Sequence, residues 1–476
     1  MQPHNFHFAV QPFLYRLGFN QPDTMKKLLI LSLLFSFTLS GTAQEGMPKI
    51  LSMEDRAVVI NQLLEDKIKT VLPGLMRREG IDMWVVISRE YNEDPVIKTL
   101  LPSTWLAARR RTVLVMYDQG GDKGIETLAV ARYNVGASFK SAWDKEKQPD
   151  QWARVAEIIR ERKPKKIGIN KSEHFGLADG IVSTDLEEFT AAVDKKYRDR
   201  IVSAEKVAIG WLETRTEAEM LLYQQICRIG HRIIQESFSD KVIQPGVTTT
   251  DEVVWYMRDR MAELGLQAWF HPTVDVQRAD PDNAEGQRSF SQRPGSDVIL
   301  PGDLLHCDIG FTYLRLNTDQ QQLAYVLKPG ETDVPEYLKE AMKKGNRLQD
   351  IFTNNFKEGR TGNEVLKMSR DQAIAEGIIP SIYSHPIGYH GHGAGTTLGM
   401  WDSQGGVPVK GDYPLHLNTA YSIELNATVH IKEWGKDIRI MLEDEAIFDE
   451  TGVWYIDGRQ TDENIYLIPR VPARQK

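Results

Sequence analysis

Two aspartates, Asp308 and Asp319, are the first residues whose types and spacing suggest chemistry. They lie 11 residues apart in HCDIGFTYLRLNTDQQQLAYVL, where Asp308 interrupts an apolar strand pattern. If the chain turns near Tyr313-Leu314, the two aspartates oppose each other across an antiparallel pair, with Cβ atoms about 5 Å apart. Like charges at that distance destabilise a sheet unless a cation lies between them. The alternative is two solvated turn aspartates with no shared role.

A second pair of carboxylates, Glu424 and Glu443, interrupts two neighbouring strand patterns in AYSIELNATVHIKEWGKDIRIMLEDEAIF. A hairpin with its midpoint between Glu433 and Trp434, inside a polar stretch, places these two glutamates opposite each other. A slip in register would bring a different acidic residue to the same face, because side chains alternate along a strand. The two residues that could take this position are Asp444 and Glu445.

Three of the chain's 11 histidines fall within SHPIGYHGHGAG, namely His385, His390 and His392. The glycines among them let the backbone approach a bound group closely. A lone histidine is usually a packed or solvated residue. The alternative interpretation of His392 is therefore a packed or exposed loop residue. Three histidines in one glycine-rich segment indicate a site.

Together, Asp308, Asp319, His385, Glu424 and Glu443 form a set of four carboxylates and one imidazole. At 4 Å and an effective dielectric constant near 20, each pair of like charges costs about 4 kcal/mol. Two divalent cations offset four negative charges, and two metals about 3.5–4 Å apart can activate water and polarise a carbonyl. Oxygen ligands with one imidazole suit manganese, cobalt, iron or zinc. The set therefore predicts a dinuclear metal hydrolase.

Residues 50–205, upstream of these groups, alternate helix-like and strand-like segments, as an α/β domain does. Apolar residues recur at helical spacing from Met53 to a glycine at position 80. Short runs rich in β-branched and aromatic residues predict strands at 81–88, 112–118, 127–133 and 165–170. Helices are predicted at 151–162 and 184–193.

Residues 206–470 carry the candidate site and follow a different order of elements. A long helix is predicted from about Glu213, and Thr248, Thr249 and Thr250 precede a second helix. Strands follow, then helices at 335–359 and 363–377, then more strands. This order predicts a duplicated α+β unit that places the carboxylates on strands.

The composition describes a folded, enzyme-sized protein. The chain has 476 residues, 26% of them charged, and a formal net charge of −8, which gives no attraction to nucleic acid or anionic membranes. From Met25, two lysines precede an apolar run and a small-residue cleavage site, which predicts a signal peptide at 25–43 and an exported protein, secreted or periplasmic. Residues 1–24 read as an upstream extension. An uncleaved membrane anchor is the alternative.

The two cysteines, Cys227 and Cys307, are too few for a disulfide scaffold or a four-thiolate zinc site. Export permits a disulfide between them. Two buried free thiols are the equal alternative.

These residues resemble the pita-bread metallopeptidases (aminopeptidase P, prolidase, methionine aminopeptidase and the related creatinase), and are most similar in type to Xaa-Pro aminopeptidase. The resemblance spans about residues 50–470 and rests on the order Asp, Asp, His, Glu, Glu, the 11-residue aspartate spacing and the His–Pro–Ile–Gly run at 385–388. It implies an α/β amino-terminal domain and an α+β pita-bread catalytic domain holding two divalent metal ions, with manganese first among the candidates. A homodimer is a further family expectation.

The resemblance also implies a role for each residue. Asp308 and Asp319 would be the first metal ligands, His385 would bind one ion, and Glu443 would bridge both. Glu424 would be a ligand that takes a proton from the metal-bound water. The remaining catalytic residue is His392, which would bind substrate and stabilise the oxyanion.

The sequence departs from the family pattern at several positions near these ligands. Gln320-Gln321-Gln322 replaces the usual Thr-Arg pair after Asp319, Gly393 replaces the acidic residue after His392, and Leu425-Asn426 follows Glu424. An alternative register would leave Thr396 or Thr397 in the position of the ligand histidine. We prefer His385 because its glycine and its partner histidine have the family spacing.

Upstream, the family's further histidine is replaced by Phe290 and Ser291, and the nearest histidine upstream of these two positions is His271. We expect His271 to help bind substrate, with Trp269, Phe270 and Tyr389 as candidates for a proline pocket.

Three hypotheses follow from the sequence. The first is an exported metalloaminopeptidase that removes the amino-terminal residue from Xaa-Pro peptides through a metal-bridging hydroxide. The second keeps the fold and metals but acts as a prolidase-type dipeptidase, or as a creatinase-like hydrolase or lyase. The third is a binding module with a degenerate site.

Overall fold

The computed structural model of the protein describes residues 46–280 and 296–469. The predicted upstream extension at 1–24 and signal peptide at 25–43 lie outside these residues, as do Phe290 and Ser291. The chain from Pro48 onward forms one compact unit, and the predicted boundary between domains at 205/206 stays a prediction. Within the described ranges, no helix combines the length and the apolar character needed to cross a membrane.

The first part of this unit is built around one six-stranded sheet. Its helices are α3 (Met53–Thr70), α4 (Leu72–Arg78), α5 (Ile97–Leu100), α6 (Gln151–Arg162), α7 (Ser183–Ala192), α8 (Lys195–Arg198) and α9 (Glu205–Glu213), with 3-10 turns η1 (Gly121–Lys123) and η2 (Gly176–Ala178). Its strands are β1 (Met83–Arg89), β2 (Arg111–Asp118), β3 (Ile125–Val130), β4 (Lys140–Ser141), β5 (Ile167–Ile169) and β6 (Ile201–Ser203). The strand order is β4-β3-β2-β1-β5-β6, and the predicted α/β fold is confirmed.

Strand β1 shows why this segment reads as a continuous apolar run. Trp84 and Val86 belong to one buried core, which includes residues of α4 and α9. The alternate residues Met83, Val85 and Ile87 belong to a second core, which includes residues of α6. Because side chains alternate between the faces of a strand, a strand covered on both sides is apolar at every position.

The second part carries four long helices and two groups of strands. The helices are α10 (Glu217–Ser237), α11 (Thr250–Glu263), α12 (Glu336–Asn354) and α13 (Gly362–Ala375). Strands β7 (Gln267–Ala268), β8 (Thr273–Gln277), β9 (Leu304–Ile309), β10 (Phe311–Tyr313), β11 (Leu316–Asn317) and β12 (Gln320–Val326) follow α11. Strands β13 (Ile379–Ile382), β14 (His385–Pro386), β15 (Thr419–Ser422), β16 (Leu425–Ile431), β17 (Lys436–Leu442), β18 (Glu445–Asp449), β19 (Gly452–Tyr455) and β20 (Tyr466–Ile468) follow α13. The predicted order of helices and strands is confirmed.

Three of these helices begin with the same local signal. Thr216, Thr249 and Thr361 are the N-caps of α10, α11 and α13, and each forms a capping box with a glutamate three residues later. Such a box satisfies two backbone N–H groups that a helix start leaves without partners. The long helix predicted from about Glu213 therefore starts at Glu217, because Thr216 caps it and the preceding helix α9 ends at Glu213.

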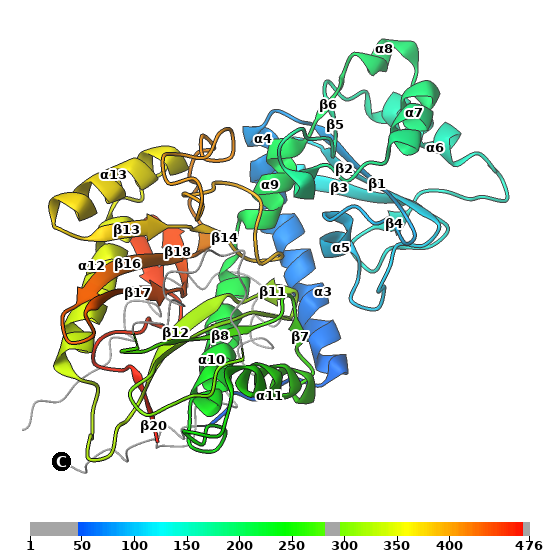
Figure 1. The fold of residues 1–476 in the computed structure, drawn as a ribbon. Coiled ribbons are helices and arrows are strands. Elements are labelled where there is room, and N and C mark those ends of the chain that lie inside the picture. Colours follow the sequence, from blue (N-terminus) through cyan, green and yellow to red (C-terminus); the bar gives the residue numbers. More distant parts are fainter. Residues whose placement is uncertain (1–45, 281–295, 470–476) are drawn as a thin grey trace, which may run out of the picture. The chain divides into compact units, whose positions relative to one another are not determined.

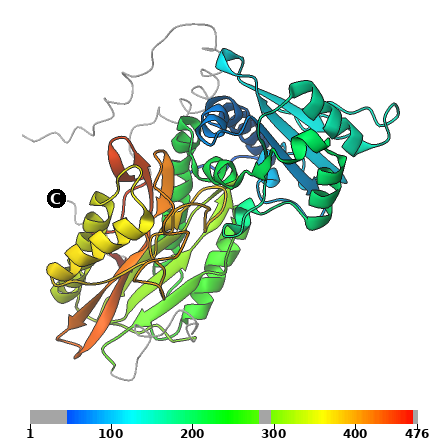
Figure 2. The ribbon, with the colours of Figure 1, turned by 90° about the horizontal axis from the view of Figure 1, so that it is seen from above.

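The long helices pack against strands of both groups. Helix α12 contacts β16 and β17, α13 contacts β13, and α11 contacts β8. In Figures 1 and 2, the yellow helices α12 and α13 lie together on one side of the orange and red strands. The core between them is apolar and includes Leu348, Phe352, Ile440 and Leu442. This packing holds the hairpin of β16 and β17, next to Glu424 and Glu443, against α12.

The hairpin that carries Glu424 and Glu443 has the predicted register. Leu425 pairs with Leu442 and Ile431 with Lys436, so the midpoint lies between Glu433 and Trp434. The strand residues next to Leu425 and Leu442 are the two glutamates, which therefore face each other where the hairpin ends.

The predicted direct opposition of Asp308 and Asp319 is wrong. Asp308 pairs with Gln321 across β9 and β12, because the chain turns at Leu314-Arg315 and not at Tyr313-Leu314. Both turn residues have a positive φ, 53° and 67°, as a two-residue hairpin turn requires. Asp319 still lies on the face of Gln321, since the side-chain period of a strand is two.

Candidate metal centre

The five predicted ligands come from five places where strands begin, end or pair. Asp308 lies on β9, Asp319 directly precedes β12, and His385 opens β14. Glu424 separates β15 from β16, and Glu443 follows the end of β17. The two sheets meet here through an antiparallel bridge between Gln321 and Glu443. The site is therefore held by backbone pairing on several sides.

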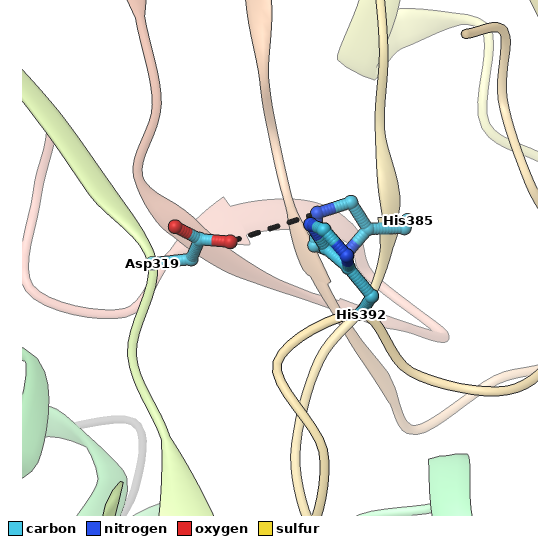
Figure 3. Close-up of side chains that lie close together, drawn as sticks. All are labelled: Asp319, His385 and His392. Carbon is cyan, nitrogen blue, oxygen red and sulfur yellow. Dashed lines mark ion pairs between the residues drawn. The ribbon is translucent and has the colours of Figure 1, made fainter. Parts of the chain in front are cut away.

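The structure brings all five residues into contact with at least two others. Three groups each have ligand atoms within 4.8 Å of one another: Asp308, Asp319 and Glu443; His385, Glu424 and Glu443; and Asp319, His385 and His392. The Nε2 atom of His385 lies 3.7 Å from Asp319 Oδ2 and 4.0 Å from Glu443 Oε1. Figure 3 shows Asp319 and His385 pointing toward each other, with His392 beside them.

The buried polar atoms at this point fit a cation. His385 Nδ1 donates a hydrogen bond to the carbonyl of Pro386 at 3.1 Å, which leaves Nε2 with its lone pair directed at the carboxylates. Within the described residues, His385 Nε2 and Asp308 Oδ1 are buried and have no hydrogen-bond partner. A buried polar group without a partner costs free energy. Neutral imidazole and carboxylate oxygens are the ligands that divalent transition metals take.

The pKa shifts have the same origin. Burial, together with the neighbouring Glu443 carboxylate, raises the pKa of Asp308 and of Asp319 well above the usual range. Burial and the nearby Asp308 raise the pKa of Glu424 to about 8. Burial lowers the pKa of His385 to about 3, so its ring is neutral. These shifts describe a buried cluster in which four negative charges need a cation or protons.

His392 lies at the exposed edge of the cluster. Its ring centroid is 4.7 Å from that of His385 and 5.2 Å from that of Trp269. Trp269 is itself fixed by a hydrogen bond from its Nε1 to the Thr318 carbonyl at 2.8 Å. Partial enclosure lowers the pKa of His392. His392 therefore lies beside the candidate metal ligands and is exposed to solvent.

Two residues that the sequence did not indicate as part of the site, Gln321 and Ser422, donate hydrogen bonds to the glutamates. Gln321 Nε2 donates to Glu424 Oε1 at 2.9 Å and to Glu443 Oε2 at 2.6 Å. Ser422 Oγ donates to Glu443 Oε1 at 2.5 Å. Strand periodicity could have identified both residues, because residues two apart on a strand share a face. Gln321 is two residues after Asp319, and Ser422 is two residues before Glu424.

Two further predicted residues, His271 and Tyr389, have partners other than the five candidate ligands. His271 Nδ1 lies 3.1 Å from Arg258 Nη1, and its ring packs on Trp255. The role of His271 in substrate binding stays a prediction. Tyr389, named as a candidate for the proline pocket, instead packs between the cations of Lys67 and Arg215.

The structure distinguishes between the alternative interpretations that the sequence allowed for the acidic residues, the threonines and the cysteines. Asp444 and Glu445 are not in the inward position, since they bond to Gln322 and Gln320 respectively. Thr396 donates to the Pro414 carbonyl, while His385 takes the place among the carboxylates. The two cysteines, Cys227 and Cys307, are buried free thiols.

Comparisons with known proteins agree with this geometry. The sequence profile of the family described as "Metallopeptidase family M24" matches residues 222–448, a segment that contains all five predicted ligands. No curated protein sequence matches the chain.

Solved structures with a similar fold cover nearly all of the described chain. An X-Pro aminopeptidase from Thermotoga maritima has a TM-score of 0.57 at 17% identity, and the match covers 82% of this chain and 99% of that one. An Xaa-Pro dipeptidase from Bacillus anthracis has a TM-score of 0.53 at 17% identity, covering 87% and 100%. The dipeptidase PepE from Mycobacterium ulcerans has a TM-score of 0.53 at 16% identity, covering 87% and 99%.

At these identities the structural likeness describes the fold, and the profile match describes the family. Residues 222–448 therefore match metallopeptidase family M24, and the chain has the pita-bread fold with an amino-terminal α/β region.

Proposed function

We propose that the protein is an exported aminopeptidase that uses two divalent metal ions and removes the amino-terminal residue from Xaa-Pro peptides. The observation that carries the proposal is the clustering of Asp319, Glu424 and Glu443 around His385, whose buried Nε2 has no hydrogen-bond partner, with Asp308 beside Asp319 and Glu443. Asp308, Asp319, His385, Glu424 and Glu443 would hold the ions. When bound, such ions lower the pKa of water and polarise the scissile carbonyl.

Glu424 is the residue best placed to accept a proton during hydrolysis. Its Oε1 accepts a hydrogen bond from Gln321, and we assign the proton to Oε2. Burial and Asp308 raise the pKa of Glu424 in the metal-free chain. Bound cations would lower this pKa, so that the ionised carboxylate could act as the general base.

His392 is the residue proposed to stabilise the developing negative charge on the substrate. Its ring contacts His385 and Trp269 on the protein side and faces solvent on the other. A donor held beside the reacting carbonyl stabilises an oxyanion without reorganisation. Removing one such donor typically costs about 100- to 1,000-fold in kcat.

Preference for proline after the cleaved bond is supported by fold likeness, because two of the similar structures carry the names X-Pro aminopeptidase and Xaa-Pro dipeptidase. The same likeness supports a second candidate, a prolidase-type dipeptidase. The two candidates differ in the substrate that they cleave: an aminopeptidase cleaves longer peptides, and a prolidase cleaves dipeptides.

The test is hydrolysis of Xaa-Pro-Xaa peptides and Xaa-Pro dipeptides by the manganese-loaded protein, with His392→Ala alongside. The aminopeptidase proposal predicts release of the first residue from the longer peptide and a loss of about 100-fold or more in kcat for His392→Ala, with metal retained. Cleavage of dipeptides alone would select the prolidase. No cleavage of either substrate by protein that holds two metals would move the function to a non-peptide substrate.

Export is the part of the proposal that rests on sequence alone. The positively charged and apolar segment at 25–43 supports it. Expression of the full chain in a bacterium with separation of periplasm, medium and cytosol tests it. Export predicts a protein outside the cytosol whose amino terminus lies near residue 44, and intact protein in the cytosol would refute it.

A further inference from the structure

We infer that Gln321 is a positioning residue of the metal centre, which fixes the orientations of Glu424 and Glu443 through a single side-chain amide. The inference rests on the proposed metal site and adds a function for a residue that is not itself a ligand. Gln321 is 5% exposed and lies directly behind the two glutamates.

Both N–H bonds of the Gln321 amide are used at this point. Nε2 donates to Glu424 Oε1 at 2.9 Å and to Glu443 Oε2 at 2.6 Å. An amide nitrogen has two hydrogens, so each glutamate receives one of them. The two carboxylates, which come from opposite strands of a hairpin, are therefore tied together by one side chain.

The other end of the amide is also fixed. His306 Nε2 lies 2.9 Å from Gln321 Oε1, and since this oxygen only accepts, the imidazole donates. On the other side of the ring, His306 Nδ1 lies 3.4 Å from Asp275 Oδ2. An inverted amide would direct its oxygen at two carboxylate oxygens, Glu424 Oε1 and Glu443 Oε2. The partners thus allow only one amide orientation.

Glu443 shows what this orientation does for a bound cation. Its Oε2 accepts from Gln321 at 2.6 Å and its Oε1 accepts from Ser422 at 2.5 Å. A carboxylate has about four lone-pair sites, two on each oxygen. One hydrogen bond on each oxygen leaves a lone pair on each for a metal, which is the arrangement that a bridging carboxylate needs.

The backbone of Gln321 reinforces the side chain. Gln321 N donates to the Glu443 carbonyl at 3.0 Å, and Glu443 N lies 3.4 Å from the Gln321 carbonyl. This bridge joins the strand that carries Gln321 to the end of the hairpin that carries Glu443. Movement of either strand would change the side-chain and main-chain bonds together.

The neighbouring glutamine Gln322 provides a matched control. It is buried on the opposite face of β12, where its Nε2 donates to both oxygens of Asp444 at 3.0 and 3.1 Å. Asp444 is not one of the five ligands. Gln321→Met and Gln322→Met therefore remove similar buried hydrogen bonds from adjacent positions. Only Gln321→Met removes hydrogen bonds to the candidate metal ligands.

The experiment measures the affinity of the full chain for Mn²⁺ by titration calorimetry and counts bound ions by elemental analysis, in the parent and both variants. Loss of a residue that orients metal ligands lowers affinity by about 10- to 100-fold. We expect a loss of that size for Gln321→Met and less than about 3-fold for Gln322→Met. Circular dichroism confirms that each variant is folded.

A third variant keeps the test decisive if Gln321→Met does not fold. His306→Phe removes the donor that orients the amide while leaving Gln321 in place, and we expect it also to weaken Mn²⁺ binding, by less than Gln321→Met. Equal affinities in the parent, Gln321→Met and His306→Phe, or equal losses for Gln321→Met and Gln322→Met, would overturn the role of Gln321. A parent that binds Mn²⁺ but cleaves no peptide would refute the proposed function and leave this inference standing, whereas a parent that binds no Mn²⁺ refutes both.

Discussion

At the scale of single residues, the site depends on balancing negative charge in a buried space. The Glu443 side chain and the Oδ1 atom of Asp308 are buried, and each of these two carboxylates raises the pKa of its neighbours. The raised pKa values favour protonated carboxyl groups in the metal-free chain. Cations bound by these predicted ligands would displace the protons, so metal binding and proton release would be linked.

Asp308→Asn removes one negative charge while keeping the side-chain shape. Because Asp308 is a predicted ligand, we expect lower metal occupancy and a loss of activity greater than about 100-fold, which exceeds the usual effect of changing a ligand's supporting partner. Elemental analysis and peptide hydrolysis measure both effects. Asp437→Asn is the control, since Asp437 bonds to the exposed His430 and its loss should change neither quantity.

Metal binding should release protons near neutral pH. The pKa of Glu424 is raised from 4.5 to about 8, so at pH 7 the metal-free carboxyl holds a proton that a cation must displace. Calorimetry of Mn²⁺ binding in two buffers with different ionisation enthalpies counts these protons. We expect net release at pH 7 that falls as the pH rises above 8. Release that does not depend on pH would contradict the shift.

The raised pKa of Glu424 also predicts the direction in which the stability of the metal-free protein changes with pH. The folded protein holds a proton on Glu424 that the unfolded chain releases above pH 4.5, so this group's contribution to the free energy of unfolding decreases as the pH rises from 4.5 through 8. Thermal melts of metal-free protein should therefore shift to lower temperature across this range, and added Mn²⁺ should reverse the shift.

At the scale of elements, the loop after β14 positions His392 through Trp269. A Cβ atom on Gly391 would lie 2.3 Å from the Trp269 ring, closer than any real contact. Gly391→Ala must therefore displace Trp269 or the loop, and His392 with it. We expect kcat to fall about 10-fold or more, since small misplacements of catalytic groups are costly, while bound metal is unchanged.

The control for this prediction is Gly405→Ala, because nothing lies within 4 Å of a Cβ atom at Gly405 and its backbone is not left-handed. Steady-state hydrolysis by both variants measures the effect. A Gly391→Ala variant with the kcat of the parent would show that the loop tolerates the displacement and that Trp269 does not position His392.

The two hairpins of the site show what the sequence can and cannot predict about these elements. The register of the Glu424–Glu443 hairpin was predictable because its turn falls in a polar stretch between clear strand patterns. The other hairpin turns at Leu314-Arg315, where neither residue is of a type that favours a positive φ. The turn was therefore misplaced by one residue, and Asp308 was paired with Asp319 instead of Gln321.

Gln321 itself could not be predicted from its residue type. A glutamine after Asp319 reads as a departure from the family pattern, and its function depends on two carboxylates and a histidine that lie far away in the sequence. A site formed by these carboxylates and His385 was predictable, because repulsion among carboxylates has few solutions, and the structure brings these residues together. Their supporting hydrogen bonds required the strand pairing of the folded protein.

At the scale of the whole molecule, a buried group of charges connects α3 with the start of α10. Lys67 Nζ donates to the Thr214 carbonyl at 2.6 Å and lies 3.4 Å from Glu219. It also lies 4.3 Å from the ring of Tyr389, three residues before His392. Burial, with Arg215 nearby, lowers the pKa of Lys67 to about 7. This contact joins the amino-terminal region to the loop of the site.

Lys67→Met should destabilise the folded protein by about 3 kcal/mol, because it removes one partner of a buried ion pair and leaves Glu219 with less compensation. Urea denaturation followed by tryptophan fluorescence and by circular dichroism measures the change. The control Lys343→Met removes a cation that is exposed among carboxylates, and should change stability by less than about 0.5 kcal/mol. Equal stabilities for the two variants would contradict the role of Lys67.

The central claim, that the protein is a dinuclear metallopeptidase, is tested most directly by titrating metal-free protein with Mn²⁺ while measuring bound ions and peptide hydrolysis in the same samples. We predict that hydrolysis of an Xaa-Pro-Xaa peptide appears as the ions fill the site and reaches its maximum at two ions per chain. Hydrolysis that is complete without bound metal, or a chain that binds no metal at all, would contradict the account.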